Sequence, residues 1–328
     1  MSASERHPPF ISLVVPCFNE SAVIAIFHQT LTCYLGQVDC AGYEIVFIND
    51  GSRDSTLQCM CELAANDSHI VIIDLARNFG KEAALTAGLD ESRGDVVIPM
   101  DVDLQDPPEV IGQFLARWRE GYDVVLGRRC DRKSDSWIKR FTARAFYSLQ
   151  NRLADVPLPH DVGDFRLMDR QVIEALKTLP ERRRFMKGLF AWVGHRTAIV
   201  DYRRDARIAG TSKFSGWKLW NFALEGITSF STLPLRVWTY LGALIATLSI
   251  IYACYIVVRT LIHGVDLPGY ASLLASILLL SGIQLIGIGV IGEYIGRIYM
   301  ESKQRPIYLI RKRYGRSIKQ QSVVTHAP

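Results

Sequence analysis

The 328-residue sequence has few charged residues and lacks several features that would define its class directly. Only 22% of its residues are charged, against about 25% in ordinary soluble domains. Glycine and proline, at 24 and 13 residues, are near average, which excludes collagen-like and low-complexity chains. A hydrophobic content of 49%, with 10% aromatic residues, excludes a disordered chain. The sequence therefore predicts a folded protein of about two domains.

The cysteines and glycines form no common metal or nucleotide motif. The seven cysteines are scattered, and Cys59 and Cys61 have neither the CxxC spacing nor a neighbouring histidine cluster. Zinc binding and a disulfide framework are therefore not expected, and the cysteines are interpreted as reduced cytosolic thiols. No GxGxxG follows the first expected strand, and neither GxxxxGKS nor GxxxxGKT occurs, which excludes the common dinucleotide and P-loop sites.

Two long stretches carry no charge at all. Residues 237–258 and 267–292 contain 22 and 26 uncharged residues, and a membrane-spanning helix needs about 20. The link 259–266 is short, so the two stretches predict a helical hairpin with both ends on one side of a membrane. The basic residues after it place the tail and the N-terminal region in the cytoplasm by the positive-inside rule. Two buried core helices are the alternative.

Two further segments have the composition of helices at a membrane surface. Residues 212–234 are rich in tryptophan and phenylalanine, and residues 137–153 mix apolar with basic residues. Ordinary amphipathic helices on the globular domain are the alternative. The N-terminus has no apolar signal-peptide core, so export is not expected. The expected organisation is a globular domain over residues 1–211, interfacial helices over 212–234, two transmembrane helices over 235–298 and a basic cytoplasmic tail over 299–328.

Short apolar runs alternate with helical stretches over the first 127 residues. The expected strands are residues 11–15, 44–48, 70–73, 96–98 and 124–126. The expected helices are residues 20–34, 54–65, 81–92 and 108–120. Continuous apolar strands are typical of a sheet covered by helices on both faces. The pattern predicts an α/β fold with a mostly parallel, doubly wound sheet, whose ligands bind at the carboxyl ends of the strands.

Polar residues follow the first, second and fourth of these strands. The clusters are residues 16–20, 49–52 and 101–106, and each alone could be a turn or a helix cap. Together they bring many carboxylates to one edge of the sheet, where a cation or ligand hydrogen bonds would offset the charge. Asp101 and Asp103 supply the hard oxygen ligands that Mg²⁺ or Mn²⁺ prefers. Asp50 is placed to accept hydrogen bonds from a base or ribose, so transfer from a nucleotide-activated donor fits.

The combined motifs resemble family-two glycosyltransferases with the GT-A fold. The motifs are Pro16-Cys-Phe-Asn-Glu20, Asn49-Asp-Gly-Ser52, Phe79-Gly-Lys-Glu-Ala-Ala84, Asp101-Val-Asp-Leu-Gln-Asp-Pro107, Gly163-Asp-Phe-Arg-Leu167, Arg184-Phe-Met-Lys-Gly188 and Arg207-Ile-Ala-Gly-Thr-Ser-Lys-Phe214. Within these enzymes, the chain is similar to polyprenyl-phosphate glycosyltransferases, and most of all to the bactoprenol glucosyltransferases of O-antigen and lipopolysaccharide modification. Phe18 stands where the family usually has tyrosine.

The resemblance implies transfer of glucose from UDP-glucose to undecaprenyl phosphate at the cytoplasmic leaflet of the bacterial inner membrane, with inversion at the anomeric carbon. It implies Mg²⁺ or Mn²⁺ as cofactor, a homo-oligomer such as a tetramer, and no role for nucleic acid. The implied nucleotide-sugar residues are Pro16, Asn19, Glu20, Asp50, Lys81, Asp101, Arg207, Ser212 and Lys213. The implied metal ligands are Asp101 and Asp103, the implied catalytic residues Asp103 and Asp164, and the implied lipid-phosphate residues Arg128 and Arg140.

Several alternatives stay open at this stage. No residue separates glucose from galactose, N-acetylglucosamine, a deoxyamino sugar or the mannose of GDP-mannose. Asp164 could instead be a helix N-cap or a partner of Arg166, and Arg128 and Arg140 could lie on a solvated or headgroup-facing surface. A processive polysaccharide synthase is disfavoured because the QxxRW motif is missing, Gln113 to Trp118 being one residue too long. A non-catalytic membrane scaffold is the alternative of a different class.

Overall fold

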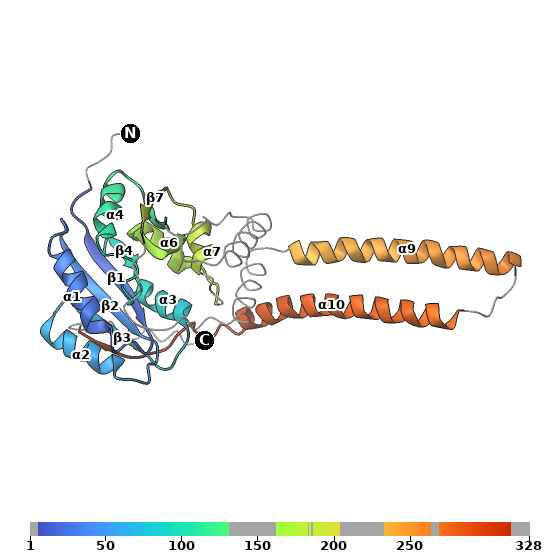
Figure 1. Ribbon diagram of the computed structural model, residues 1–328, viewed down its shortest axis with the longest axis horizontal. Coiled ribbons are helices and arrows are strands. Elements are labelled where there is room, and N and C mark those ends of the chain that lie inside the picture. The colour runs from blue at the N-terminus through green and yellow to red at the C-terminus, as the bar shows by residue number, and fades with distance from the viewer. Residues whose placement is uncertain are drawn as a thin grey trace, which may run out of the picture.

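The computed structural model describes residues 6–130, 162–182, 184, 186–203, 233–263 and 269–315. The strands are β1 (Phe10–Cys17), β2 (Gly42–Asn49), β3 (Ile70–Leu75), β4 (Val96–Pro99), β5 (Val124–Arg129), β6 (Val162–Asp169), β7 (Thr197–Tyr202) and β8 (Ile310–Tyr314). The helices are α1 (Ile24–Leu35), α2 (Thr56–Asn66), α3 (Lys81–Glu91), α4 (Val110–Arg119), α6 (Arg170–Thr178), α7 (Met186–Trp192), α9 (Leu233–His263) and α10 (Tyr270–Ser302). Figure 1 shows a sheet domain from which α9 and α10 extend as a hairpin.

The eight described strands form one sheet in the order β7-β5-β6-β4-β1-β2-β3-β8. β4, β1, β2 and β3 are parallel neighbours, whereas β6 is antiparallel to β4 and β5, and β8 is antiparallel to β3. The predicted α/β class and mostly parallel GT-A-like sheet are confirmed for the β1–β4 region. Since β6 and β8 run against their neighbours, the complete sheet is mixed.

Helices cover both faces of the sheet, as the apolar strands predicted. Side chains alternate along a strand, so in β1 Leu13 and Val15 join the core under α1, α2 and α4, whereas Val14 joins the core under α3 and α6. Both sets are fully buried. Each face of the sheet is therefore held by its own layer of helices. This packing fixes the positions of the strands and of their carboxyl ends at one edge.

The predicted helical hairpin is confirmed by α9 and α10. Gly287 on α10 lies against the indole of Trp238 on α9, and a side chain there would overlap the ring. Within the described part of the chain, however, no helix is long and apolar enough to cross a membrane. The structure thus confirms the hairpin, and the prediction that its two helices span a membrane is not confirmed.

The chain returns to the domain after α10. Residues 310–314 form β8 beside β3, with Ile72 opposite Tyr314 and Ile73 opposite Arg313. Arg313 also forms a 2.7 Å ion pair with Glu91 at the end of α3. The sequence analysis placed these residues in a basic tail and predicted no strand there, because short basic segments carry little strand signal on their own.

Several predicted features lie outside the described residues. These are the segment 137–153, most of the segment 212–234, and the candidate site residues Arg140, Arg207, Ser212 and Lys213.

Candidate active site

Loops after β1, β2 and β4 meet at the carboxyl edge of the sheet. They enclose a pocket of about 400 Å³. Its lining is Pro16, Cys17, Phe18, Glu20, Asp50, Asn78, Gly80, Lys81, Ala84, Asp101, Val102 and Asp103. Six of the predicted donor or metal residues are thus brought together, because the strands that precede them are parallel neighbours. Their roles in binding stay predictions.

Asp50 follows β2 and organises the next loop of the pocket. Its carboxylate accepts hydrogen bonds from the backbone N–H groups of Phe79, at 2.7 Å, and Gly80, at 3.0 Å. Burial raises the pKa of Asp50, and these two hydrogen bonds together with Arg77 oppose the rise. Gly80 has φ +99°, a conformation that favours glycine. Asp50 therefore shapes the turn that delivers Lys81, besides facing the pocket.

The loops after β1 and β2 are joined to each other by hydrogen bonds. Asn19, with φ 56°, accepts a bond from the Arg53 N–H at 2.8 Å and donates its own N–H to Ser52 Oγ at 3.0 Å. The Glu20 N–H donates to Thr56 Oγ1 at 2.8 Å. Asn19 thus connects the two loops that form this side of the pocket, while Glu20 lines the pocket itself.

Lys81, the first residue of α3, links two predicted functional carboxylates. Its Nζ lies 2.7 Å from Asp101 Oδ1 and 2.9 Å from Asp164 Oδ2. Burial alone would lower the pKa of Lys81, but Asp101 and Asp164 outweigh it and raise that pKa. The pKa of Asp164 falls to about 2, because Lys81 and Lys187 outweigh the effect of burial. Asp164 is therefore ionised at neutral pH, with a low affinity for protons.

Arg166 is not the partner of the Asp164 carboxylate. Asp164 lies inside β6 and is no N-cap, and the Arg166 guanidinium donates to the carbonyl oxygens of Gly163, at 2.8 Å, and Asp164, at 3.4 Å. Burial lowers the pKa of Arg166 to about 10, against the opposing effects of Asp164 and Glu82. The guanidinium also lies over the Phe190 ring at 4.2 Å. The N-cap alternative for Asp164 is thus wrong, whereas Arg166 still acts on the Asp164 carboxylate through its charge and helps to lower the pKa of Asp164.

Glu82 is a residue that the sequence analysis missed. Its carboxylate accepts a hydrogen bond from the Met186 N–H, at 3.1 Å, at the start of α7. Burial and the nearby Asp164 raise the pKa of Glu82 to about 7, although Lys81 and Lys187 oppose the rise. The only available signal was its place beside Lys81 in the Phe79–Ala84 motif, where an acidic first turn is an ordinary helix feature.

The sequence matches two protein-family models, and these matches identify the family. The model of glycosyl transferase family 2 matches residues 12–177, and the model of the GtrB C-terminal hairpin matches residues 233–298. The chain belongs to glycosyltransferase family 2. It is an enzyme of that family, and the hairpin is the C-terminal domain of one of its branches.

Several relatives of this glycosyltransferase align over nearly the whole chain. It is 54% identical over 303 residues to the bactoprenol glucosyl transferase of Shigella phage SfX, covering 92% of this chain and 99% of the relative. It is 55% identical over 301 residues to the bactoprenol glucosyl transferase of Shigella phage SfV, covering 92% and 98%. An uncharacterized glycosyltransferase of Synechocystis is 50% identical over 305 residues, covering 93% and 96%.

Two carboxylates of the glycosyltransferase suit a divalent metal ion. Asp101 and Asp103 both line the pocket, and Asp103 Oδ1 also accepts a bond from the Gln105 N–H at 3.2 Å. Among the described residues no group of three or more histidine, cysteine, aspartate or glutamate side chains could hold a metal. The two carboxylates are hard oxygen donors, and their chemistry fits Mg²⁺ or Mn²⁺.

Two polar residues near the pocket have other partners. Asp106, the last acidic residue of its motif, is buried and accepts a 2.5 Å hydrogen bond from the Tyr202 hydroxyl. It therefore joins the loop after β4 to β7. Arg128, predicted to hold a lipid phosphate, lies on β5 and binds both carboxylate oxygens of Asp201, at 2.6 and 2.9 Å. Both side chains are about half-exposed, so an acceptor phosphate would have to compete with Asp201.

Proposed function

We propose that the enzyme transfers glucose from UDP-glucose to undecaprenyl phosphate, with inversion at the anomeric carbon. The observation that carries the proposal is the bridge of Lys81 between Asp101 and Asp164, at the edge of the sheet where the pocket lies. The bactoprenol glucosyl transferases that align over 92% of the chain support glucose and a polyprenyl acceptor. The same site chemistry would serve another nucleotide sugar.

In the proposed reaction an acceptor phosphate oxygen forms a bond to the sugar C1 while the bond from C1 to UDP breaks. A phosphate monoester has its second pKa near 6, so the acceptor is mostly dianionic at neutral pH. The attacking oxygen carries no proton, and no general base has to remove one. Asp164, with its pKa near 2, is poorly suited to take a proton. This supports a role for Asp164 in orientation and charge.

Lys81 and the carboxylates would provide positioning and charge stabilisation. The Lys81 ammonium can donate to a diphosphate or sugar oxygen, and Asp50 accepts hydrogen bonds beside it. Asp101 and Asp103 would hold a divalent ion, which when bound supplies Lewis-acid stabilisation of the leaving diphosphate. Such preorganised charges are typically the largest catalytic contribution in transfer of this kind.

A lipid acceptor is consistent with the hairpin. Its helices expose large apolar side chains, among them Tyr240 at 75% and Leu261 at 82% exposure, and surfaces of this kind mark protein or membrane contacts. We propose that the hairpin brings the domain to the cytoplasmic face of a bacterial inner membrane, where Arg140, Arg207, Ser212 and Lys213 complete the acceptor and diphosphate sites. Self-association through the hairpin into a homo-oligomer belongs to the same proposal.

The test is incubation of the purified full chain with undecaprenyl phosphate, Mg²⁺ or Mn²⁺, and a panel of UDP- and GDP-sugars. The expected product is undecaprenyl phosphate with one added hexose from UDP-glucose, identified by mass, with inverted anomeric configuration by NMR. If only another donor gives a product, its sugar would replace glucose in the proposed reaction. Absence of glycolipid from every donor would overturn the proposed reaction.

A further inference from the structure

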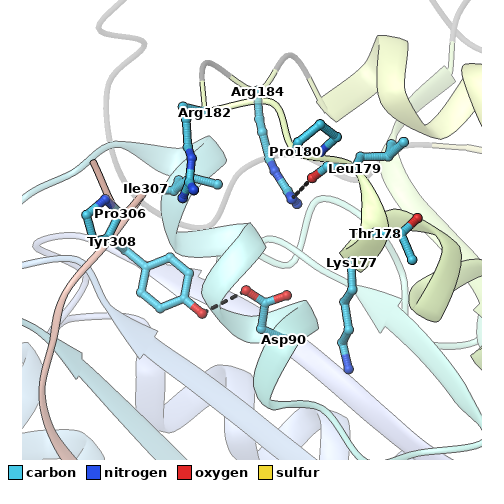
Figure 2. A pocket seen from close by; sticks show the side chains of 10 residues that line it. All are labelled: Asp90, Lys177, Thr178, Leu179, Pro180, Arg182, Arg184, Pro306, Ile307 and Tyr308. Atoms are coloured by element: carbon cyan, nitrogen blue, oxygen red, sulfur yellow. Dashed lines mark hydrogen bonds between the residues drawn. The ribbon is translucent and has the colours of Figure 1, made fainter. Parts of the chain in front are cut away.

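A second pocket lies at the far end of α3 from the candidate active site. It has a volume of about 440 Å³ and is lined by the end of α6, the segment after α6 and the segment after α10 (Figure 2). Asp90, near the end of α3, lines it, whereas Lys81 begins the same helix in the active site. At ~1.5 Å per residue, these two residues lie about 14 Å apart along α3. The second pocket is therefore a separate site.

Three cationic side chains, Lys177, Arg182 and Arg184, line this pocket, here called the basic pocket. Arg184 donates to the carbonyl oxygen of Leu179 at 3.0 Å (Figure 2). It also donates to the carbonyl oxygen of Glu181 at 3.3 Å, and the two bonds fix the guanidinium. A guanidinium has five N–H donors, so these two bonds leave others for a ligand.

Arg182 is the cationic residue of the basic pocket whose side chain has the fewest interactions with the rest of the described residues. Its backbone N–H donates to both carboxylate oxygens of Glu301, each at 3.0 Å, and this joins the segment to the end of α10. Among the described residues, the Arg182 guanidinium itself forms no hydrogen bond or ion pair. Lys177 pairs at 3.0 Å with Glu174, which is 57% exposed, and an exposed pair of this kind contributes little and exchanges readily.

The acidic group inside the basic pocket is already hydrogen-bonded. The Tyr308 hydroxyl donates to Asp90 at 2.7 Å (Figure 2). Burial raises the pKa of Asp90, whereas Tyr308, Arg184 and Lys177 oppose the rise. Asp90 is the one acidic side chain in the lining, against the three cationic ones, so the lining has a net positive charge that suits an anion. The planar forks of the guanidinium groups match the oxygens of a phosphate group better than a single-point cation does.

Exposed apolar side chains lie on the last turns of α10, the helix whose end is joined to the Arg182 segment. Ile295, Ile298 and Tyr299 are 58%, 67% and 58% exposed, and they come just before Glu301, which holds the Arg182 backbone. A cationic pocket beside an apolar helix face matches a ligand that has an anionic head and an apolar tail.

We propose that the basic pocket binds the phosphate group of an amphiphile, such as the headgroup of an anionic lipid. The proposal rests on the pocket's own residues and not on the proposed transfer reaction. The phosphate would lie between Arg182 and Arg184, with Lys177 nearby, and the tail would lie along the exposed side of α10.

The experiment measures binding to the full chain in a neutral maltoside detergent, by calorimetry and by the shift in thermal unfolding midpoint. The probes are dioctanoyl phosphatidic acid, dioctanoylglycerol, which lacks the phosphate, and inorganic phosphate. We expect phosphatidic acid to bind at least about tenfold more tightly than dioctanoylglycerol, and Arg182→Gln to remove most of this difference, since charge-assisted bonds to phosphate are strong.

Matched variants locate the effect. Arg182→Lys should keep most of the binding and Lys177→Gln should weaken it, whereas Arg117→Gln, at an exposed pair on α4, should leave it unchanged. A different outcome is that inorganic phosphate binds wild type but not Arg182→Gln, and that phosphatidic acid binds no more tightly than dioctanoylglycerol. This outcome would identify the ligand as a soluble phosphate and overturn the lipid assignment. Equal binding of every probe to wild type and Arg182→Gln would overturn the site. The rate at which each variant consumes the nucleotide sugar is measured in a separate assay. That assay tests the proposed reaction, so failure of the basic pocket and failure of the reaction can be told apart.

Discussion

The ammonium of Lys81 lies 2.9 Å from a carboxylate oxygen of Asp164, and the same ammonium lies 2.7 Å from Asp101. A predicted metal ligand after β4 and a predicted catalytic residue in β6 therefore share one cation. Without this shared cation, the two carboxylates would repel each other strongly in their partly buried site.

Replacing Lys81 with methionine should lower kcat/KM by at least about tenfold, because a charge-assisted contact at the reacting centre is lost. The same change should raise the pKa of Asp164 from its value of about 2 toward the ordinary range, since Lys81 is the largest influence that lowers it. Steady-state kinetics at neutral pH measure the loss of rate, and an NMR titration of the Asp164 carboxyl group below pH 5 measures the shift of its pKa. Lys81→Arg should recover part of the rate, and wild-type rates in Lys81→Met would contradict the role.

Asp103→Ala should nearly abolish turnover, whereas Asp164→Asn should leave a measurable rate. The reason is that Asp103 would hold the metal, while the dianionic acceptor needs no strong base. Initial rates are measured with Mg²⁺ or Mn²⁺, and donor binding is measured alongside. Removal of the metal by a chelator should reproduce the Asp103→Ala loss in wild type. Equal and complete loss in both variants with intact donor binding would refute the weak-base mechanism.

Glu82 should make the folded protein less stable as the pH rises from about 4.5 to 7. Its pKa is about 7 in the folded state, against an ordinary 4.5, so the unfolded chain releases its proton first and gains stability. The penalty is absent below both values, grows between them and stays constant above 7, at roughly 3 kcal/mol. Compared with Glu82→Gln, the thermal midpoint of wild type should match at pH 4 and be lower at pH 8. An unchanged difference across that range would contradict the assignment.

Gly51→Ala should destabilise the pocket wall. Gly51 has φ +63°, and an added Cβ would overlap the backbone of Asn78 and Arg77. The left-handed conformation costs about 1 kcal/mol without glycine, and the overlap adds to it. We expect a lower thermal midpoint together with a raised KM for the nucleotide sugar. Gly242→Ala, at a position with open space in α9, is the matched control and should change neither.

Much of the sheet and the pocket wall could be predicted from sequence because their signals are local. The buried runs around Leu13 and Ile45 mark parallel strands, and parallel strands bring Asp50 and Asp101 to one edge whatever the details. The bridge of Lys81 to Asp164 could not be predicted, because it depends on β6 entering the sheet antiparallel, next to β4. That pairing is non-local and leaves no periodic trace in the sequence.

Two other features escaped prediction for related reasons. The pair of Arg128 with Asp201 depends on the pairing of β5 with β7, which no local pattern in the sequence shows. Glu82 is an ordinary first-turn acid until α7 packs above it. In both residues the chemistry is set by a neighbour that lies far away in sequence.

The place of β8 in the sheet sets an order for the folding of this protein during its synthesis. β3 is complete early, at Leu75, but its partner begins only at Ile310, after both arms of the hairpin. Until the ribosome has made α10, β3 is an open edge that can pair with another chain. The catalytic sheet is therefore completed last, by residues that follow the hairpin, so the edge of β3 stays open until the whole hairpin has been synthesised.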